Sequence, residues 1–166
     1  MKNDDNLPTD FWSKNLIKSG QTLACAESCT GGGLSARITD IPGISAVFQG
    51  GVIAYDNAVK SEVLQVPVEA LEQQGAVSQP VAEAMALGVR ALLSTDFALS
   101  TTGVAGPGGG SADKPVGLVW MAIAGPQGVR SEKRLFSGNR EQIRAQAIEY
   151  SLQMLNTALI QSDTEY

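Results

Sequence analysis

The stretch LACAESCTGGG, residues 23–33, places an apolar run directly before a serine, a cysteine and three glycines. Residues 22–26 predict a strand, and residues 30–38 predict a helix that the chain enters through the glycines. Ser28 would then stand at the carboxyl end of the strand, where open α/β sheets bind their ligands. Two interpretations follow: Ser28 is a nucleophile on a sharp turn, or Ser28 or Thr30 caps the helix, a common role for both residue types.

Strand and helix patterns alternate outward from this stretch and predict a mixed sheet covered by helices on both faces. Neither a repeat nor a linker interrupts the pattern, and 166 residues suit a single domain. The predicted helices span about 8–18, 57–65, 68–73, 80–93 and 139–160; the predicted strands span 50–55 and 97–101, and a hairpin joins 115–124 to 128–136.

The charge balance excludes several kinds of partner. Twelve basic against 17 acidic residues give a net charge of −5, without a basic cluster, so we expect no nucleic-acid partner. Residues 1–12 are polar and acidic, and no run reaches the ~18 to 20 apolar residues of a membrane span. We therefore expect a cytoplasmic protein without a membrane partner.

The numbers of cysteines and histidines limit the kinds of catalysis and metal binding that the chain can support. The cysteines, Cys25 and Cys29, lack the spacing of a zinc site or a redox pair, so we expect structural thiols and no metal. The chain contains no histidine, which excludes Ser-His-Asp and Cys-His catalysis within one chain. If Ser28 is a nucleophile, its base must be a lysine, tyrosine, aspartate or glutamate.

The stretch YDNAVK, residues 55–60, supplies one such base. Tyr55 is expected to end a strand, and Lys60 falls in the first turn of the helix that follows. Lysine titrates at ~10.4, so a working base needs its pKa lowered by about three units, or ~4 kcal/mol. The helix dipole supplies at most ~1 to 2 kcal/mol, so burial beside Ser28 would have to supply the rest. An ordinary exposed lysine is the alternative.

A glycine-rich loop, TGVAGPGGG at residues 102–110, follows the strand at 97–101. It lacks Gly-Lys-Ser/Thr and precedes a strand, so it is neither a P-loop nor a dinucleotide-binding turn. One interpretation is a main-chain cradle in which glycines let N–H groups approach an anion or a planar ring. The other is a flexible entry to the hairpin.

Six motifs occur together and in order along the chain. They are AESCTGG (26–32), YxNxxK (Tyr55, Asn57 and Lys60), LEQQGAVS (71–78), TGVAGPGGG (102–110), KPVGLVW (114–120) and FSGNR (136–140). Over about residues 8–160 the sequence resembles the CinA carboxyl-terminal domain family, whose characterised enzymes are nicotinamide mononucleotide amidohydrolases. With few residues before the first helix, it looks like the stand-alone form.

The resemblance implies a three-layer α/β/α sandwich and an activity without a cofactor. The expected reaction hydrolyses the carboxamide of nicotinamide mononucleotide to nicotinate mononucleotide and ammonia, in pyridine nucleotide recycling. The resemblance also implies that Ser28 is the nucleophile, with Lys60 and Tyr55 beside it. In the mechanism we expect, neutral Lys60 takes the Ser28 proton while Tyr55 relays or orients it.

The remaining site residues are expected to surround the substrate. Amide N–H groups near Thr30 and Gly31 would hold the oxyanion, and the glycines at 31–33 would leave room for the substrate. Arg140 and Arg144, four apart on one helical face, could meet the phosphate or be ordinary surface charges. The expected substrate-binding set is Glu27, Thr30, Gly31, Gly32, Thr102, Gly103, Gly106, Gly109, Gly110 and Arg140.

Two other functions remain open from the sequence. One is a binding or regulatory module that keeps the nucleotide pocket without chemistry, and the other is a serine amidase for a different small amide. The sequence also leaves open a homo-oligomer.

Overall fold

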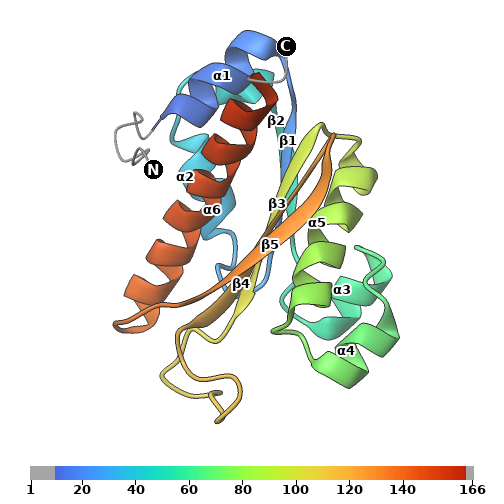
Figure 1. Ribbon diagram of the computed structural model, residues 1–166, viewed down its shortest axis with the longest axis vertical. Helices are drawn as coiled ribbons and strands as arrows, with labels where there is room; N and C mark the ends of the chain where they lie inside the picture. Colours follow the sequence, from blue (N-terminus) through green and yellow to red (C-terminus); the bar gives the residue numbers. More distant parts are fainter. Residues whose placement is uncertain (1–9, 164–166) are drawn as a thin grey trace.

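The computed structural model describes residues 10–163, which form a sheet with helices on both sides (Figure 1). In chain order the elements are α1 (Phe11–Ser19), β1 (Leu23–Glu27), α2 (Gly33–Thr39), the 3₁₀ turn η1 (Ile44–Ala46), β2 (Phe48–Ile53), α3 (Asn57–Glu62), α4 (Val68–Gln74), α5 (Gln79–Leu93), β3 (Phe97–Gly103), β4 (Leu118–Gly125), β5 (Gly128–Leu135) and α6 (Arg140–Asp163).

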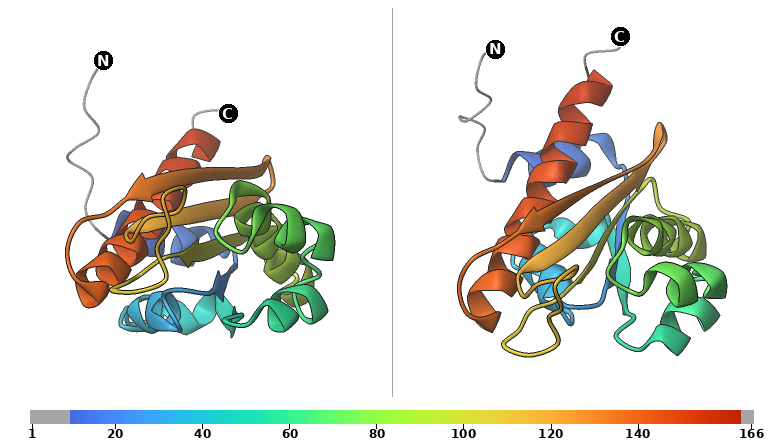
Figure 2. Two further views of the ribbon diagram at one scale, coloured as in Figure 1. Left: turned by 90° about the horizontal axis from the view of Figure 1, so that it is seen from below. Right: turned by 60° about the horizontal axis from the view of Figure 1, so that its bottom comes forward.

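The sheet is mixed, as the sequence predicts. Its strand order is β2-β1-β3-β4-β5; β1 runs parallel to β2 and β3, and β4 is antiparallel to β3 and β5. Helices α1, α2 and α6 cover one face, and α3, α4 and α5 lie on the other (Figures 1 and 2). The three-layer α/β/α sandwich is therefore confirmed.

The two faces of the sheet differ in side-chain size. On the α6 side, Leu23 and Cys25 of β1 join Leu99 of β3 in the larger core. On the α5 side the alternate positions carry small residues, such as Ala24, and the sheet is packed against the apolar face of α5. The hydroxyl of Ser100, on the same side, donates to the Ala82 carbonyl of α5 at 2.6 Å. Small side chains here let α5 lie close to the sheet.

Parallel pairing of β1 and β3 positions the candidate site. Glu27 pairs with Thr101, so both strands end at the same edge of the sheet. The backbone N–H of Ser28 donates to the Thr101 carbonyl at 2.9 Å, which carries the pairing one residue further. Ser28 therefore leaves β1 beside the end of β3, where Thr102 and Gly103 are still paired with β4. The loop between β3 and β4 projects from this same end of the molecule (Figure 1).

Several boundaries differ from the predicted ones. Helix α2 begins at Gly33 instead of Thr30 because Gly31 and Gly32 have φ values of 56° and 98°, which a right-handed helix does not allow. Strand β2 ends at Ile53, so Tyr55 lies beyond it. Residues 8 and 9 of the first predicted helix lie outside the described residues.

No helix within residues 10–163 is long and apolar enough to cross a membrane.

Candidate active site

A cavity of about 320 Å³ opens at the end of the sheet where β1 and β3 finish. It lies among the β1–α2 turn, the start of α3, the glycine-rich loop and the start of α6. Its walls are formed by Ser28, Cys29, Tyr55, Asn57, Lys60, Ala76, Val77, Thr102, Gly103, Val104, Ala105, Gly106, Gly108, Gly109 and Arg140. The structure thus brings together eight of the predicted site residues: Ser28, Tyr55, Lys60, Thr102, Gly103, Gly106, Gly109 and Arg140.

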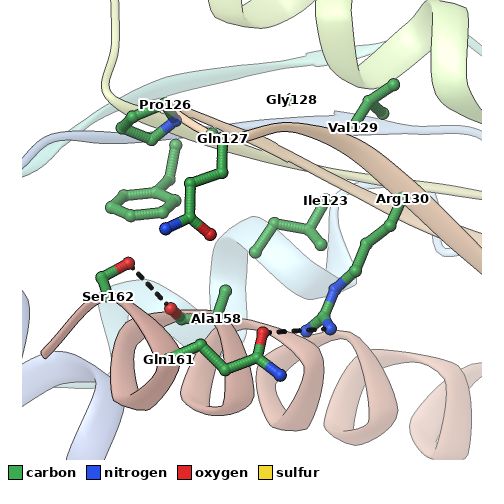
Figure 3. Close-up of a pocket in the computed structure, with 11 residues that line it drawn as sticks. Ile123, Pro126, Gln127, Gly128, Val129, Arg130, Ala158, Gln161 and Ser162 are labelled. Carbon is green, nitrogen blue, oxygen red and sulfur yellow. Dashed lines mark hydrogen bonds between the residues drawn. The ribbon is translucent and has the colours of Figure 1, made fainter. Parts of the chain in front are cut away.

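A second cavity, of about 140 Å³, lies at the opposite end of the sheet between the β4–β5 turn and the end of α6. Figure 3 shows Gln127 and Arg130 pointing from the hairpin toward Ala158 and Gln161 of α6. Arg130 is the charged residue among its described lining residues, and it already donates to the Met154 carbonyl at 3.2 Å. Among the described residues that line it, no serine or cysteine contacts a lysine, so the first cavity is the candidate active site.

Ser28 and Lys60 are in direct contact. Lys60 Nζ donates to Ser28 Oγ at 3.0 Å and to the backbone carbonyl of Tyr55 at 3.0 Å. The Lys60 residue is only 1% exposed and Ser28 is 9% exposed. Lys60 is therefore not an ordinary surface lysine. Its buried amine lies within hydrogen-bond distance of Ser28, in the turn that follows β1.

Burial is the main influence on the titration of Lys60. Desolvation lowers the pKa of the Lys60 amine, whereas the charge of Asp56 opposes that shift. Helix α3 has only six residues, so Lys60 lies in its last turn as well as near its start. The positive and negative ends of so short a helix are both close to Lys60, so the helix dipole does not explain the shift. Burial alone accounts for the lowered pKa of Lys60.

Two oxygen atoms of Tyr55 accept hydrogen bonds at the candidate site. Its carbonyl oxygen accepts the second hydrogen bond of Lys60, which orients the amine. Its ring is 60% exposed, and its hydroxyl accepts a hydrogen bond from Arg140 Nη2 at 3.2 Å. The Tyr55 backbone thus orients the amine, while within residues 10–163 the hydroxyl lies at the rim and forms no hydrogen bond with Ser28 or Lys60.

Arg140 connects two parts of the cavity rim through hydrogen bonds. Besides the Tyr55 hydroxyl, it donates from Nη1 to the Gly106 carbonyl of the glycine-rich loop at 2.7 Å. The base of this loop is held by Val104, which donates to the Leu118 carbonyl at 2.9 Å. The described residues of the cavity wall include the cationic Arg140 and no carboxylate. This charge pattern suits an anionic ligand, although the whole chain is acidic.

Five predicted substrate-binding residues do not line the cavity: Glu27, Thr30, Gly31, Gly32 and Gly110. The N–H of Gly31, expected at the oxyanion, donates to the Ser28 carbonyl at 3.0 Å and closes the turn. The glycines at 31–33 do not leave room for a substrate either. A Cβ on Gly32 would meet the Ile53 side chain at 3.1 Å, and one on Gly33 would meet Ile148 at 2.9 Å.

Glu27, which was expected to bind the substrate, has a structural role instead. Its side chain is buried in the turn, and both carboxylate oxygens accept hydrogen bonds from residues of the turn and of α2. Arg144 is likewise a turn contact, because it donates to the carbonyls of Cys29 and Thr30 at 3.1 and 2.8 Å. It is neither a free surface charge nor part of the cavity wall.

The two cysteines are free and buried, as expected of structural thiols. Burial raises the pKa of Cys29 to about 12 and raises that of Cys25 well above its usual range. The thiol next to Ser28 therefore stays protonated at neutral pH and is a poor nucleophile.

Seven wall residues were not among the expected site residues: Cys29, Asn57, Ala76, Val77, Val104, Ala105 and Gly108. The Ala76 carbonyl accepts a hydrogen bond from the Thr102 hydroxyl at 2.9 Å, which joins the α4–α5 connection to the end of β3. All seven lie within motifs noted in the sequence: AESCTGG, YxNxxK, LEQQGAVS and TGVAGPGGG. Five of them are glycine, alanine or valine, which are common in any core and give no chemical signal in a sequence.

Similar solved structures support this architecture. The CinA superfamily protein of Klebsiella pneumoniae 700603 superposes with a TM-score of 0.88 at 33% identity, over 92% of this chain and 96% of that one. The competence/damage inducible protein of Agrobacterium tumefaciens gives a TM-score of 0.84 at 39% identity, over 93% of this chain and 98% of that one.

Sequence relatives agree with the structural ones. A CinA-like protein of Parasynechococcus marenigrum is 58% identical over 125 residues, which is 75% of this chain and 30% of that protein. A CinA-like protein of Desulfotalea psychrophila is 49% identical over 95% of this chain and 38% of its own length. The chain thus spans only about a third of these relatives. The family model described as the CinA C-terminal domain matches residues 8–159, and the chain belongs to that family.

Proposed function

We propose that the protein hydrolyses the carboxamide of nicotinamide mononucleotide to nicotinate mononucleotide and ammonia, with Ser28 as nucleophile and Lys60 as base. The observation that carries the proposal is the 3.0 Å contact between Lys60 Nζ and Ser28 Oγ inside the cavity. A buried lysine with a lowered pKa is the kind of group that can accept a serine proton where no histidine exists.

The proposed reaction has two halves. Neutral Lys60 accepts the hydroxyl proton as Ser28 Oγ attacks the carboxamide carbon, and a tetrahedral oxyanion forms. The C–N bond then breaks, Lys60 returns the proton to the leaving nitrogen, and ammonia departs from an acyl-serine. In the second half Lys60 takes a proton from water, whose oxygen attacks the ester carbon, and the proton finally returns to Ser28 as the acid leaves.

The oxyanion needs a donor other than Gly31. Cys29 follows the nucleophile and lines the cavity, and its backbone N–H donates to no backbone carbonyl within the described part of the chain. The N–H after a nucleophile is a common oxyanion donor on strand-to-helix turns. We assign that role to the Cys29 N–H, which replaces the pair expected from the sequence.

The charge and size of the cavity support a nucleotide substrate. Arg140 begins α6, so its side chain and the positive end of a long helix both favour an anion at the rim. A volume of about 320 Å³ falls within the range of ~300 to 1,000 Å³ typical of small-molecule sites. The phosphate would lie at the rim and the carboxamide near Ser28.

The direct test measures ammonia released from nicotinamide mononucleotide by the wild type, Ser28→Ala and the control Ser19→Ala. Ser19 is exposed at the end of α1, so its substitution should leave turnover unchanged. We expect release by the wild type and the control and none above background by Ser28→Ala. Binding without release by the wild type would favour the non-catalytic module, and much faster release from another amide would favour a different amidase.

A further inference from the structure

Glu27 forms four hydrogen bonds immediately before the candidate nucleophile. It ends β1, is 1% exposed and adjoins Ser28 in the chain. Its Oε1 accepts from the Thr30 hydroxyl at 2.6 Å and from the Leu34 N–H at 2.7 Å. Its Oε2 accepts from the N–H of Ser35 at 3.0 Å and from the Ser35 hydroxyl at 2.7 Å.

These bonds use the whole acceptor capacity of the carboxylate, which offers about four lone-pair sites. Two of the donors are N–H groups in the first turn of α2, which have no partner within their own helix. The N-cap residue, Gly32, has no side chain that could accept them. Glu27 therefore caps α2 from the preceding strand, and no lone pair is left for a substrate or a transferred proton.

The same carboxylate connects the turn to β3. Thr30 has a single hydroxyl hydrogen, which it donates to Glu27, so the 2.7 Å contact between the Thr30 and Thr101 hydroxyls has Thr101 as donor. The Thr101 carbonyl in turn accepts the N–H of Ser28 at 2.9 Å. Glu27, Thr30, Thr101 and Ser28 thus form a closed ring of covalent and hydrogen bonds around the turn.

Arg144 of α6 also holds the turn. Its Nε and Nη2 donate to the carbonyls of Cys29 and Thr30 at 3.1 and 2.8 Å. The turn's carbonyls thus accept hydrogen bonds from α6, and its Thr30 hydroxyl donates to Glu27 of β1. The backbone that carries Ser28 is therefore held by contacts to both a helix and a strand.

We infer that Glu27 is a positioning residue, whose carboxylate holds the 28–32 turn so that Ser28 Oγ stays at its 3.0 Å distance from Lys60 Nζ. The inference rests on the proposed function only where turnover is measured. In Glu27→Gln an NH₂ group replaces one carboxylate oxygen. That oxygen accepts two hydrogen bonds, whereas the NH₂ group is itself a donor and would face the two donors without an acceptor. The turn must then rearrange, and a displacement of about 1 Å at a nucleophile can cost ~100-fold in rate.

The test compares Glu27→Gln with the matched control Glu149→Gln. Glu149 makes an exposed ion pair with Arg37, outside the cavity and the turn. The first readout is the rate at which a fluorophosphonate labels Ser28, followed by mass spectrometry, because it needs no amide substrate. The second is kcat and KM on nicotinamide mononucleotide as a function of pH.

We expect Glu27→Gln to lower the labelling rate and kcat together by ~10- to 100-fold, while KM and the pH midpoint stay unchanged. The control should behave as the wild type. A raised KM at unchanged kcat would instead make Glu27 a substrate contact, and a moved midpoint would make it part of proton transfer. Unchanged labelling by a folded Glu27→Gln, or no labelling of the wild type, would overturn the inference.

A second variant covers the case in which Glu27→Gln does not fold. Thr30→Val keeps the carboxylate and the size of the side chain but removes the hydroxyl between Glu27 and Thr101. We expect a smaller loss in the same two rates, and unchanged rates in a folded Thr30→Val would also contradict the inference. If the wild type is labelled but releases no ammonia, the proposed function fails while the labelling comparison still decides the role of Glu27.

Discussion

Lys60 Nζ lies 3.0 Å from Ser28 Oγ, although the two residues are 32 positions apart in the chain. The contact forms because β1 and β2 are parallel neighbours, so that the turn after β1 and the helix after β2 meet at one edge of the sheet. Both side chains are nearly inaccessible, so the amine exchanges most of its water for Ser28 and the Tyr55 carbonyl. That exchange lowers the pKa of the lysine, as the proposed role as a base requires.

The first prediction concerns the pH dependence of turnover. The base must be neutral, so kcat should rise with pH and level off, with a midpoint below the ordinary lysine value of ~10.4. The charge of Asp56 raises the pKa of Lys60, so Asp56→Asn should move the midpoint lower still. Asparagine also caps helices well, so α3 should keep its start. A midpoint that rises in Asp56→Asn would contradict this account.

The second prediction concerns stability. Because the pKa of Lys60 is lower in the folded than in the unfolded state, the unfolded chain binds the proton more tightly at neutral pH. Lys60 therefore lowers the free energy of unfolding below its folded pKa, and this penalty disappears as pH rises through the unfolded value of ~10.4. Lys60→Met should abolish turnover yet unfold at an equal or higher temperature near neutral pH.

Thermal unfolding of both proteins at neutral pH and above ~10.4 checks that expectation. The difference between variant and wild type should shrink toward high pH. A variant that is markedly less stable at neutral pH would show that Lys60 stabilises the fold, against the direction of its pKa shift.

The third prediction separates the two atoms of Tyr55. Tyr55→Phe removes the hydroxyl that Arg140 contacts and keeps the carbonyl that holds Lys60. We expect a loss of ~2- to 13-fold in kcat, the size of one hydrogen bond, ~0.5 to 1.5 kcal/mol. A proton relay through the hydroxyl would instead cost ~10²- to 10⁴-fold, and steady-state kinetics distinguishes the two.

The fourth prediction assigns Arg140 to the anionic group of the substrate. Arg140→Gln should raise KM for nicotinamide mononucleotide by ~10- to 100-fold, since a hydrogen bond to a charged group contributes ~1.5 to 3 kcal/mol. The phosphate-free nucleoside should bind the wild type and the variant equally weakly. Arg37→Gln, which removes an exposed arginine paired with Glu149, is the control and should leave both constants unchanged. Equal losses for nucleotide and nucleoside would mean that Arg140 only holds the loop.

The fifth prediction concerns the thiols. With the pKa of Cys29 raised to about 12 by burial, the native protein should consume no thiol reagent near neutral pH. The unfolded chain should consume two equivalents, one for each cysteine. Rapid reaction of Cys29 in the native state would make it a rival to Ser28 as nucleophile.

The elements of the fold were predictable because their signals are local. Apolar alternation and glycine or proline positions placed the helices and strands within a few residues, including the end of α4 at Gly75. The start of α2 was predicted three residues too early, because glycine can adopt either a helical or a left-handed conformation. The structure puts Gly31 and Gly32 in the left-handed conformation, and Gly32 and Gly33 lie close to Ile53 and Ile148, a proximity that the sequence does not reveal.

The candidate site was predictable only in part from the residue types. The missing histidines limited the possible bases for Ser28, but the pairing with Lys60 was implied by the family resemblance, because the distance between the two residues depends on the parallel pairing of β1 and β2. The role of Glu27 could not be predicted, because a carboxylate beside a nucleophile is equally compatible with substrate binding. One of its four donors lies in the turn and three lie in the first turn of α2, and the sequence does not specify the shape of the turn that brings them to Glu27.

In the proposed reaction, Ser28 forms a covalent acyl intermediate with the carboxamide substrate. Rapid acid quenching of the wild type with nicotinamide mononucleotide, followed by peptide mass spectrometry, measures this directly. We predict a nicotinate mononucleotide acyl adduct on Ser28 that is absent from Ser28→Ala and from Lys60→Met. Undiminished ammonia release by Ser28→Ala, or an adduct on another residue, would contradict the account.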